Sequence, residues 1–314
     1  MDPRFRIRRL TALFLTLAAL CAVPALALFD NGDTGLGAGD APIARNLWID
    51  TYKNVAVTGV LSAALSGGEE VTYRVTKHPA RGALTFEREG GADFTYTPYE
   101  NKTGKDTFTY VAVDGEGRVS RPATVKVTIS KPATDVIYRD MAGDPAHKAA
   151  ISLAERGIFT GECLDTSYVF RPDAPVTRQE FLAMAMAAAG RSGTGYELPT
   201  GFADGDAIAV WARPYVADAL RDGTVRGSME NGGMRFEPDR PIRRGEAAVI
   251  LDRLLRLADA EAEEETLPAW AAQSVANLEA AGVLAPGEDS EETLTRASAA
   301  MLLDGAMDLA AARN

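Results

Sequence analysis

Residues 170–180 read Phe-Arg-Pro-Asp-Ala-Pro-Val-Thr-Arg-Gln-Glu, and residues 236–246 read Phe-Glu-Pro-Asp-Arg-Pro-Ile-Arg-Arg-Gly-Glu. In both copies a glycine lies 21 residues before the last arginine of the motif, which is Arg178 or Arg244. In a third copy, over residues 282–296, this distance is 14. Repeats of this length indicate stacked supersecondary units that bury their apolar faces against one another. They favour a binding architecture over an enzyme core.

Each copy predicts a helix, a loop and a second helix. Seven and four residues before the glycine every copy has an apolar residue, and this three-residue step places both on one helix face. The second helix starts at the motif arginine and carries matching apolar pairs farther along. Six such helices predict one helical domain of three repeats, at residues 135–192, 200–258 and 266–312, the last of which is degenerate.

The segment before the repeats alternates apolar and polar residues over short runs that glycine-rich turns separate. About seven such runs predict an antiparallel β-sandwich over residues 41–130. Carboxylates occur in the loop at residues 66–70 and at Asp114 and Glu116. A calcium site needs about six oxygen ligands, so we expect turn residues there and no metal site.

The first 27 residues have the pattern of a signal peptide. Four arginines fall within the first nine residues, residues 10–23 are apolar, and Ala25-Leu26-Ala27 supplies a small-x-small cleavage site. The apolar stretch is shorter than a helix that spans a membrane requires. We therefore expect residues 1–27 to be removed from an exported protein that is peripheral to the membrane afterwards.

Charge and cysteine content narrow the partners. The net charge is −11 over 314 residues, and residues 133–314 carry 30 acidic against 17 basic residues. Phosphate binding needs a basic face, so nucleic acid is not an expected partner. The 17 basic residues are 16 arginines and Lys148, and planar guanidinium groups suit carboxylate ligands. Beyond the leader only Cys163 remains, so no internal disulfide is expected.

Taken together, residues 135–312 resemble three copies of a bacterial surface-layer homology (SLH) repeat. Residues 41–130 resemble bacterial Ig-like or cadherin-like surface repeats, through residues 73–82, 94–98 and 104–110. The motifs that carry the SLH resemblance are Tyr138-Arg139-Asp140-Met141, Phe170-x-Pro172-Asp173, Val176-Thr177-Arg178-Gln179-Glu180, Phe202-Ala203-Asp204, Trp211-Ala212, Phe236-x-Pro238-Asp239, Ile242-Arg243-Arg244-Gly245-Glu246, Trp270-Ala271 and Leu294-Thr295-Arg296-Ala297.

The SLH resemblance implies a helical domain with a pseudo-threefold arrangement that holds its protein on the cell envelope without a covalent bond. The implied ligand is secondary cell-wall polysaccharide, typically pyruvylated, or another peptidoglycan-linked polymer, bound in grooves between repeats. The motif arginines Arg178, Arg244 and Arg296 are the implied contacts. A pyruvate carboxylate suits two parallel hydrogen bonds from arginine, and free N–H groups at the helix N-terminus favour an anion.

The other site residues have two interpretations each. Trp211 and Trp270 either offer a flat apolar surface to a sugar or anchor the core. Because the third copy is degenerate, we expect the grooves that depend on Arg178 and Arg244 to bind and the Arg296 groove to be weak or empty. The residues expected to be helix caps or secondary contacts are Thr177, Glu180, Glu246 and Thr295.

Alternatives to a wall anchor remain. The protein is expected at the cell surface, with the β-sandwich as a spacer or adhesion module, but a self-associating surface-layer subunit or a host-facing adhesin would share this sequence pattern. An envelope hydrolase is less favoured, since His78 and His147 are the only histidines and no nucleophile elbow, phosphate loop or zinc spacing occurs. No catalytic residue and no cofactor is expected.

Overall fold

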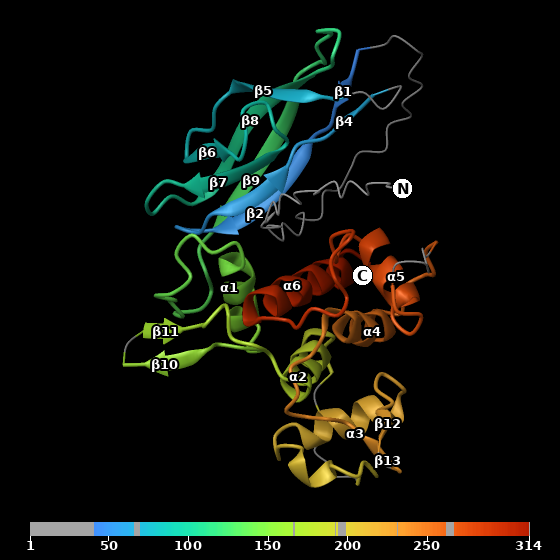
Figure 1. Ribbon diagram of the computed structural model, residues 1–314. Helices are drawn as coiled ribbons and strands as arrows, with labels where there is room; N and C mark the ends of the chain where they lie inside the picture. Colours follow the sequence, from blue (N-terminus) through green and yellow to red (C-terminus); the bar gives the residue numbers. More distant parts are fainter. Residues whose placement is uncertain are drawn as a thin grey trace, which may run out of the picture.

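The computed structural model describes residues 41–65, 70–165, 167–191, 193, 199–230, 232–261 and 267–313. The predicted signal peptide lies outside these residues. A β-sandwich is followed by a helical module, and Figure 1 shows α1 and α6 beneath the sandwich, with α3 and a small hairpin at the opposite end. Within the described ranges, no helix has the length and apolar character needed to cross a membrane.

Two sheets form the sandwich. The four-stranded sheet has the order β2 (Leu47–Tyr52), β9 (Ala123–Ser130), β8 (Gly104–Val113), β5 (Thr72–Lys77), and the three-stranded sheet has the order β3 (Val57–Val60), β7 (Asp93–Pro98), β6 (Gly82–Phe86). The two-residue strands β1 (Ile43–Ala44) and β4 (Ala63–Ala64) pair beside them. The prediction of a purely antiparallel sandwich was wrong, because β2 pairs with β9 in parallel. No hairpin joins these two strands, so no tight turn fixes their relative direction.

The core of the sandwich is aromatic. Phe94, Tyr96, Phe108 and Tyr110 are fully buried, and the rings of Phe94 and Phe108 meet edge-on with centroids 5.3 Å apart. The alternation seen in the sequence places these residues on the inner faces of β7 and β8. Burying each aromatic side chain contributes about 2–3 kcal/mol, so this cluster is a large source of stability for the sandwich.

The turn at Asp114 has the structural role expected of it. Its carboxylate accepts hydrogen bonds from the backbone N–H groups of Glu116 and Arg118, at 3.1 and 2.8 Å, and from the Arg118 side chain at 2.6 Å. These bonds stabilise the β8–β9 connection. Most of the acidic loop at residues 66–70 lies outside the described residues.

The six predicted helices are present. They are α1 (His147–Glu155), α2 (Arg178–Ala188), α3 (Arg213–Arg221), α4 (Arg244–Leu255), α5 (Ala272–Ala280) and α6 (Arg296–Ala312), and a short 3-10 helix, η1 (Gly205–Ala207), precedes α3. The apolar pairs predicted for the first helix of each copy are buried: Ala150 and Leu153, Val216 and Ala219, Val275 and Leu278. The glycine after each of these helices has a positive φ, which L-residues rarely adopt.

The repeats are not entirely helical, and this part of the predicted fold class was wrong. A hairpin of β10 (Glu162–Leu164) and β11 (Ser167–Val169) lies between α1 and α2, and one of β12 (Ser228–Glu230) and β13 (Gly233–Arg235) lies between α3 and α4. The third copy is seven residues shorter at this point, and the fully described connection from α5 to α6 contains no strand. The seven additional residues of the first two copies therefore allow the hairpins to form.

An aspartate fixes the loop that follows each hairpin. Asp140 accepts the backbone N–H groups of Phe170 and Arg171, at 3.0 and 2.7 Å. Asp204 does the same in the second copy, and residues 171 and 237 both have a φ near +57°. The aromatic-x-Asp opening and the Phe-x-Pro-Asp loop are therefore partners, which explains why the third copy lacks both.

The segments before the three motif helices hydrogen-bond to one another in a closed ring. The N–H of Val176 donates to Leu294 O at 3.1 Å, that of Leu294 donates to Ile242 O at 2.9 Å, and that of Ile242 donates to Val176 O at 2.9 Å. All three side chains are at most 1% exposed. The ring joins three copies that are far apart in sequence around one apolar centre.

The sandwich is bonded to the helical module at α1 and α6. Tyr52 Oη donates to Glu155 at 2.6 Å, and Lys148 Nζ lies 3.2 Å from Asp50, 3.6 Å from Asp304 and 3.8 Å from Asp308. Burial and the neighbouring Asp304 raise the pKa of the Asp308 carboxyl.

Candidate functional site

The three motif arginines begin α2, α4 and α6, and each guanidinium crosses to the next copy in the ring. Arg178 Nη1 lies 2.9 Å from Glu246 Oε1, and its guanidinium carbon is 5.3 Å from the centre of the Phe236 ring. Burial lowers the pKa of Arg178 and outweighs the attraction of Glu246. Its Nε is buried without a hydrogen-bond partner among the described residues, so the protein does not fully satisfy this guanidinium.

Arg296 has the corresponding position against the first copy. Its Nη1 donates to Phe170 O at 3.1 Å, and its guanidinium carbon is 5.3 Å from the centre of the Phe159 ring. Among the described residues no carboxylate pairs with it. Its charge therefore remains available to an anionic group.

Arg244 is enclosed by the third copy instead. Its Nε lies 2.9 Å from Glu288 and its Nη1 2.7 Å from Glu292, and Nη1 also donates to Asp289 O at 2.7 Å. The side chain is only 6% exposed. Two carboxylates and a carbonyl thus satisfy this guanidinium inside the protein.

The helix N-termini are not free, which corrects the expectation that their N–H groups would face an anion. The first two N–H groups of α2 donate to Arg240 O and Pro238 O, at 2.9 and 3.1 Å. Those of α4 and α6 bond in the same way to the next copy. The physical reason is that the ring of repeats uses these unpaired donors to join one copy to another.

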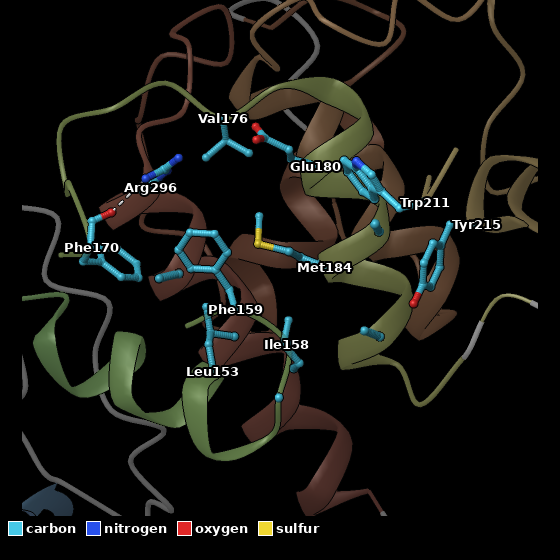
Figure 2. Close-up of a pocket in the computed structure, with 14 residues that line it drawn as sticks. Leu153, Ile158, Phe159, Phe170, Val176, Glu180, Met184, Trp211, Tyr215 and Arg296 are labelled. Carbon is cyan, nitrogen blue, oxygen red and sulfur yellow. Dashed lines mark hydrogen bonds between the residues drawn. The ribbon is translucent and has the colours of Figure 1, made fainter. Parts of the chain in front are cut away.

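Two hollows lie beside the motif arginines. The first, of about 340 Å³, is called the Arg296 groove, and it lies between the first copy, Trp211 and Tyr215 of the second, and Arg296 of the third. Figure 2 shows Arg296 at one end and Trp211 and Tyr215 at the other, with Phe159 and Met184 between them. Most of its lining is apolar.

The second hollow, of about 580 Å³, is called the Arg178 groove. It is lined by the second copy, with Arg178 from the first copy and Trp270 from the third. The two grooves have equivalent walls, since residues 66 positions apart line both: Ile158 and Thr224, Phe170 and Phe236, Glu180 and Glu246, Ala183 and Val249, Met184 and Ile250. Each groove therefore combines one copy, a tryptophan from the next copy and a motif arginine from the preceding one.

Both tryptophans belong to groove walls and not to the core. Trp211 and Trp270 are each 53% exposed, so the interpretation that they anchor the core is wrong. Each begins a short segment before α3 or α5, where the following alanine is fully buried and holds the backbone in place. A groove built on the third copy would take its aromatic wall from the first copy, which is the next one in the ring. The first copy has Pro145 at the tryptophan position, so such a groove would lack this wall.

The predicted capping residues have that role. Thr177 Oγ1 accepts the N–H of Glu180 at 3.3 Å, and Glu180 accepts the N–H of Thr177 at 2.8 Å. Thr295 and Ser298 exchange the equivalent bonds at the start of α6. Glu246 accepts the N–H of residue 243 and also holds Arg178, so it combines a cap with an ion pair.

Several groove residues were missed by the motif search. Phe159, Tyr215, Arg226, Arg240 and Arg253 line the two grooves, although none belongs to the motif. Aligning the copies at their 66-residue offset and marking the neighbours of the tryptophans would have indicated some of them. The inter-copy contacts needed the structure.

Comparisons with known proteins match the sandwich and the first two copies. The sequence model of the bacterial Ig domain matches residues 39–129, and that of the S-layer homology domain matches residues 137–182 and 201–248. The chain is an SLH-domain protein with an N-terminal bacterial Ig module. Neither matched family is a catalytic one, and SLH domains belong to proteins of the cell surface and cell wall.

The SLH-domain protein is also similar to curated and solved proteins. Over 127 residues it is 32% identical to the Surface-layer 125 kDa protein of Lysinibacillus sphaericus, a match that covers 40% of this chain and 10% of that one. The chain thus spans about a tenth of the length of this relative.

Solved structures resemble part of the SLH-domain protein at low scores. An endo-fucoidan hydrolase of glycoside hydrolase family 107 matches with a TM-score of 0.26 and 18% identity, over 33% of this chain and 15% of that one. The sialic acid binding region of a Streptococcus sanguinis adhesin matches with a TM-score of 0.22 and 12% identity, over 31% of each chain.

Proposed function

We propose that the three repeats anchor this protein non-covalently to the bacterial cell envelope by binding a cell-wall polysaccharide in the Arg296 and Arg178 grooves. The hydrogen-bonded ring of three copies supports a pseudo-threefold domain, and the sandwich is a spacer or adhesion module bonded to it. The observation that carries the proposal is that two hollows share one design. Each joins a half-exposed tryptophan to a motif arginine across an inter-copy boundary.

This design suits an acidic sugar. An exposed indole offers a flat apolar surface to one face of a sugar ring, while its N–H remains free to bond a hydroxyl. A guanidinium meets a carboxylate, such as that of a pyruvyl group, through parallel charge-assisted hydrogen bonds. Secondary cell-wall polysaccharide and peptidoglycan-linked polymers that carry such groups are the proposed ligands.

The geometry changes the expected order of the three arginines. Arg296 lines an open groove and has no carboxylate partner among the described residues, whereas Arg244 is buried between Glu288 and Glu292. We therefore assign ligand contact to Arg178 and Arg296, with Trp211 and Trp270, and a structural role to Arg244. This replaces the expectation that the third copy would weaken the Arg296 groove.

A surface-layer subunit is the second candidate. It is favoured by the similarity to a surface-layer protein, although that match covers a tenth of the relative. Ordered sheets formed by the purified chain in negative-stain electron microscopy would support this candidate, and a monomer that binds walls would support an anchored accessory protein.

The test is co-sedimentation of the full chain with purified cell-wall sacculi, before and after acid removal of the non-peptidoglycan polymer. We expect binding to intact sacculi and loss of binding after stripping. Binding that survives stripping would assign the ligand to peptidoglycan itself. Failure to bind intact sacculi would contradict the proposed function.

A further inference from the structure

The Arg178 groove concentrates arginine in an acidic half of the chain. Five of the 16 arginines in residues 133–314 line it, against the two glutamates Glu237 and Glu246. The described lining of the Arg296 groove contains one arginine and one glutamate. The excess of positive charge therefore belongs to only one of two equivalent grooves.

Part of this charge is compensated within the groove. Arg240 binds both oxygens of Glu246, at 2.6 and 3.0 Å, and its Nε lies 3.1 Å from Glu237. Arg178 shares Glu246 at 2.9 Å. These four side chains form a network that is close to neutral.

Two of the remaining arginines are uncompensated. Arg243 leaves the groove to pair with Glu291 of the third copy, at 2.6 Å. Arg226 and Arg253 have no carboxylate partner among the described residues, and both are exposed. They are the free cations of the groove within the part of the chain that the structure describes.

Arg253 is held in position by the end of α3. Its Nη1 donates to Thr224 O at 3.0 Å and is 3.5 Å from Gly223 O. Partial burial and the nearby charge of Arg226 lower the pKa of Arg253, and they outweigh the attraction of Asp252. Two like charges therefore line the same end of the groove.

A third hollow, of about 360 Å³, adjoins this end of the Arg178 groove. It shares Thr224, Arg226 and Arg253 with the Arg178 groove and adds Arg191 and Arg256. The acidic side chains that line it are Asp222, Asp252 and Asp259. The arginines of the groove thus continue into a neighbouring depression.

Two of these three carboxylates are already bonded. Asp222 is ion-paired with Arg191, and Asp252 accepts hydrogen bonds from Ser274 and Asn277 at 2.8 and 3.1 Å. Among the described residues that line this hollow, one exposed carboxylate, at residue 259, is left near the unpaired guanidinium groups.

We propose that Arg226 and Arg253 form a second anion subsite that extends the Arg178 groove, so that this groove binds an anionic polysaccharide through charged groups on successive units. The inference rests on the proposed function and specifies its ligand class. The Arg296 groove has no such extension, because its equivalent positions are Thr160 and Ala187. It accepts a single acidic sugar against apolar walls.

The test measures affinity as a function of ligand length. The full chain is titrated with oligogalacturonates of one to six units, which carry a carboxylate on every sugar, and with their methyl-esterified forms as uncharged controls. We expect affinity to rise by about tenfold from one unit to six, since each added carboxylate gains charge-assisted hydrogen bonds. The esterified series should show no such rise.

In the double variant Arg226→Gln/Arg253→Gln, the gain in affinity from one unit to six should fall to about twofold or less. The control is Arg221→Gln, which removes an exposed arginine of α3 that lines neither the Arg178 groove nor the hollow beside it, and this variant should retain the gain. Thermal unfolding of each variant checks that folding is intact. A length-independent affinity in the unmodified chain, or a full gain in the double variant, would overturn the inference. Sacculus binding, measured in parallel, decides the anchoring function separately.

Discussion

The Arg296 and Arg178 grooves are built from equivalent positions and yet differ in chemistry. Both join one copy to the tryptophan of the next and the arginine of the preceding one. Along α2 the first groove has Met184 and Ala187, whereas along α4 the second has Ile250 and Arg253. One scaffold therefore presents an apolar groove and a basic one.

The comparison teaches that the scaffold and the ligand surface are specified by different residues. The ring of backbone bonds, the caps and the buried helix faces recur in the copies and position the walls. Residues outside the motif set the charge of each groove. A motif arginine can therefore be present without an open groove beside it. Arg244 of the second copy is such a case, because Glu288 and Glu292 in the acidic loop of the third copy enclose it.

The largest expected effect separates the structural arginine from the groove arginines. Arg244→Ala should lower the free energy of unfolding by about 3 kcal/mol, because it removes a buried side chain and leaves Glu288, which is only 16% exposed, without its cation. Arg296→Ala removes one hydrogen bond to a carbonyl and should cost about 1 kcal/mol. Urea unfolding of both variants makes the measurement, and equal costs would remove the distinction.

The next effect concerns the aromatic walls. Trp211→Ala and Trp270→Ala should each weaken binding to sacculi about tenfold, since each removes the stacking surface of one groove. Both indoles are half exposed, so the free energy of unfolding should change by less than about 0.5 kcal/mol. Trp48→Ala, in strand β2 of the sandwich, is the matched control. A loss of binding in that variant would transfer the ligand site to the sandwich.

Salt should distinguish the two grooves more finely. Trp211→Ala leaves the basic Arg178 groove, and its remaining binding should fall about tenfold between about 50 and 500 mM NaCl because exposed charges are screened. Trp270→Ala leaves the apolar Arg296 groove and should lose about threefold or less. Identical salt profiles would show that the difference in lining charge does not reach the ligand.

The smallest effect depends on pH. Although burial opposes it, hydrogen bonds from Arg240 and the charge of Arg178 hold the pKa of Glu246 below its ordinary value of 4.5. A lowered pKa in the folded state stabilises the protein above the ordinary pKa, and this contribution is lost as the pH falls through the lowered pKa. Glu246→Gln should therefore reduce the loss of thermal stability between about pH 7 and pH 3.

Glu180→Gln is the control for this experiment, because Glu180 caps α2 at the same motif position without an arginine partner among the described residues. An unchanged pH dependence in Glu246→Gln would show that the ion pair does not contribute to acid stability.

Most of the fold could be predicted from sequence periodicity. The buried helix faces, the terminal glycines and the capping box at Thr177 all depend on neighbours within about one helical turn, and such local patterns are readable. The parallel pairing of β2 with β9 and the hairpins of the repeats depend on contacts or short strands without a strong local signal, and the prediction missed them.

The site was harder to predict, for a physical reason. The motif indicated all three arginines and ranked Arg178 and Arg244 above Arg296, but the role of each depends on which loop of another copy surrounds its guanidinium. Glu288 and Glu292 lie more than forty residues from Arg244, and no periodicity links them to it. Likewise, the N–H groups at the helix starts looked free because their acceptors belong to a different repeat.

The central claim is that the Arg296 and Arg178 grooves are open to a ligand and that the position at Arg244 is closed. Its most direct test is the number of ligands bound per chain. Native mass spectrometry of the full chain with a solubilised wall-polymer fragment should show two bound fragments. It should show one in Trp211→Ala and one in Trp270→Ala, and none in the double variant. Three bound fragments, or two that persist in the double variant, would contradict the account.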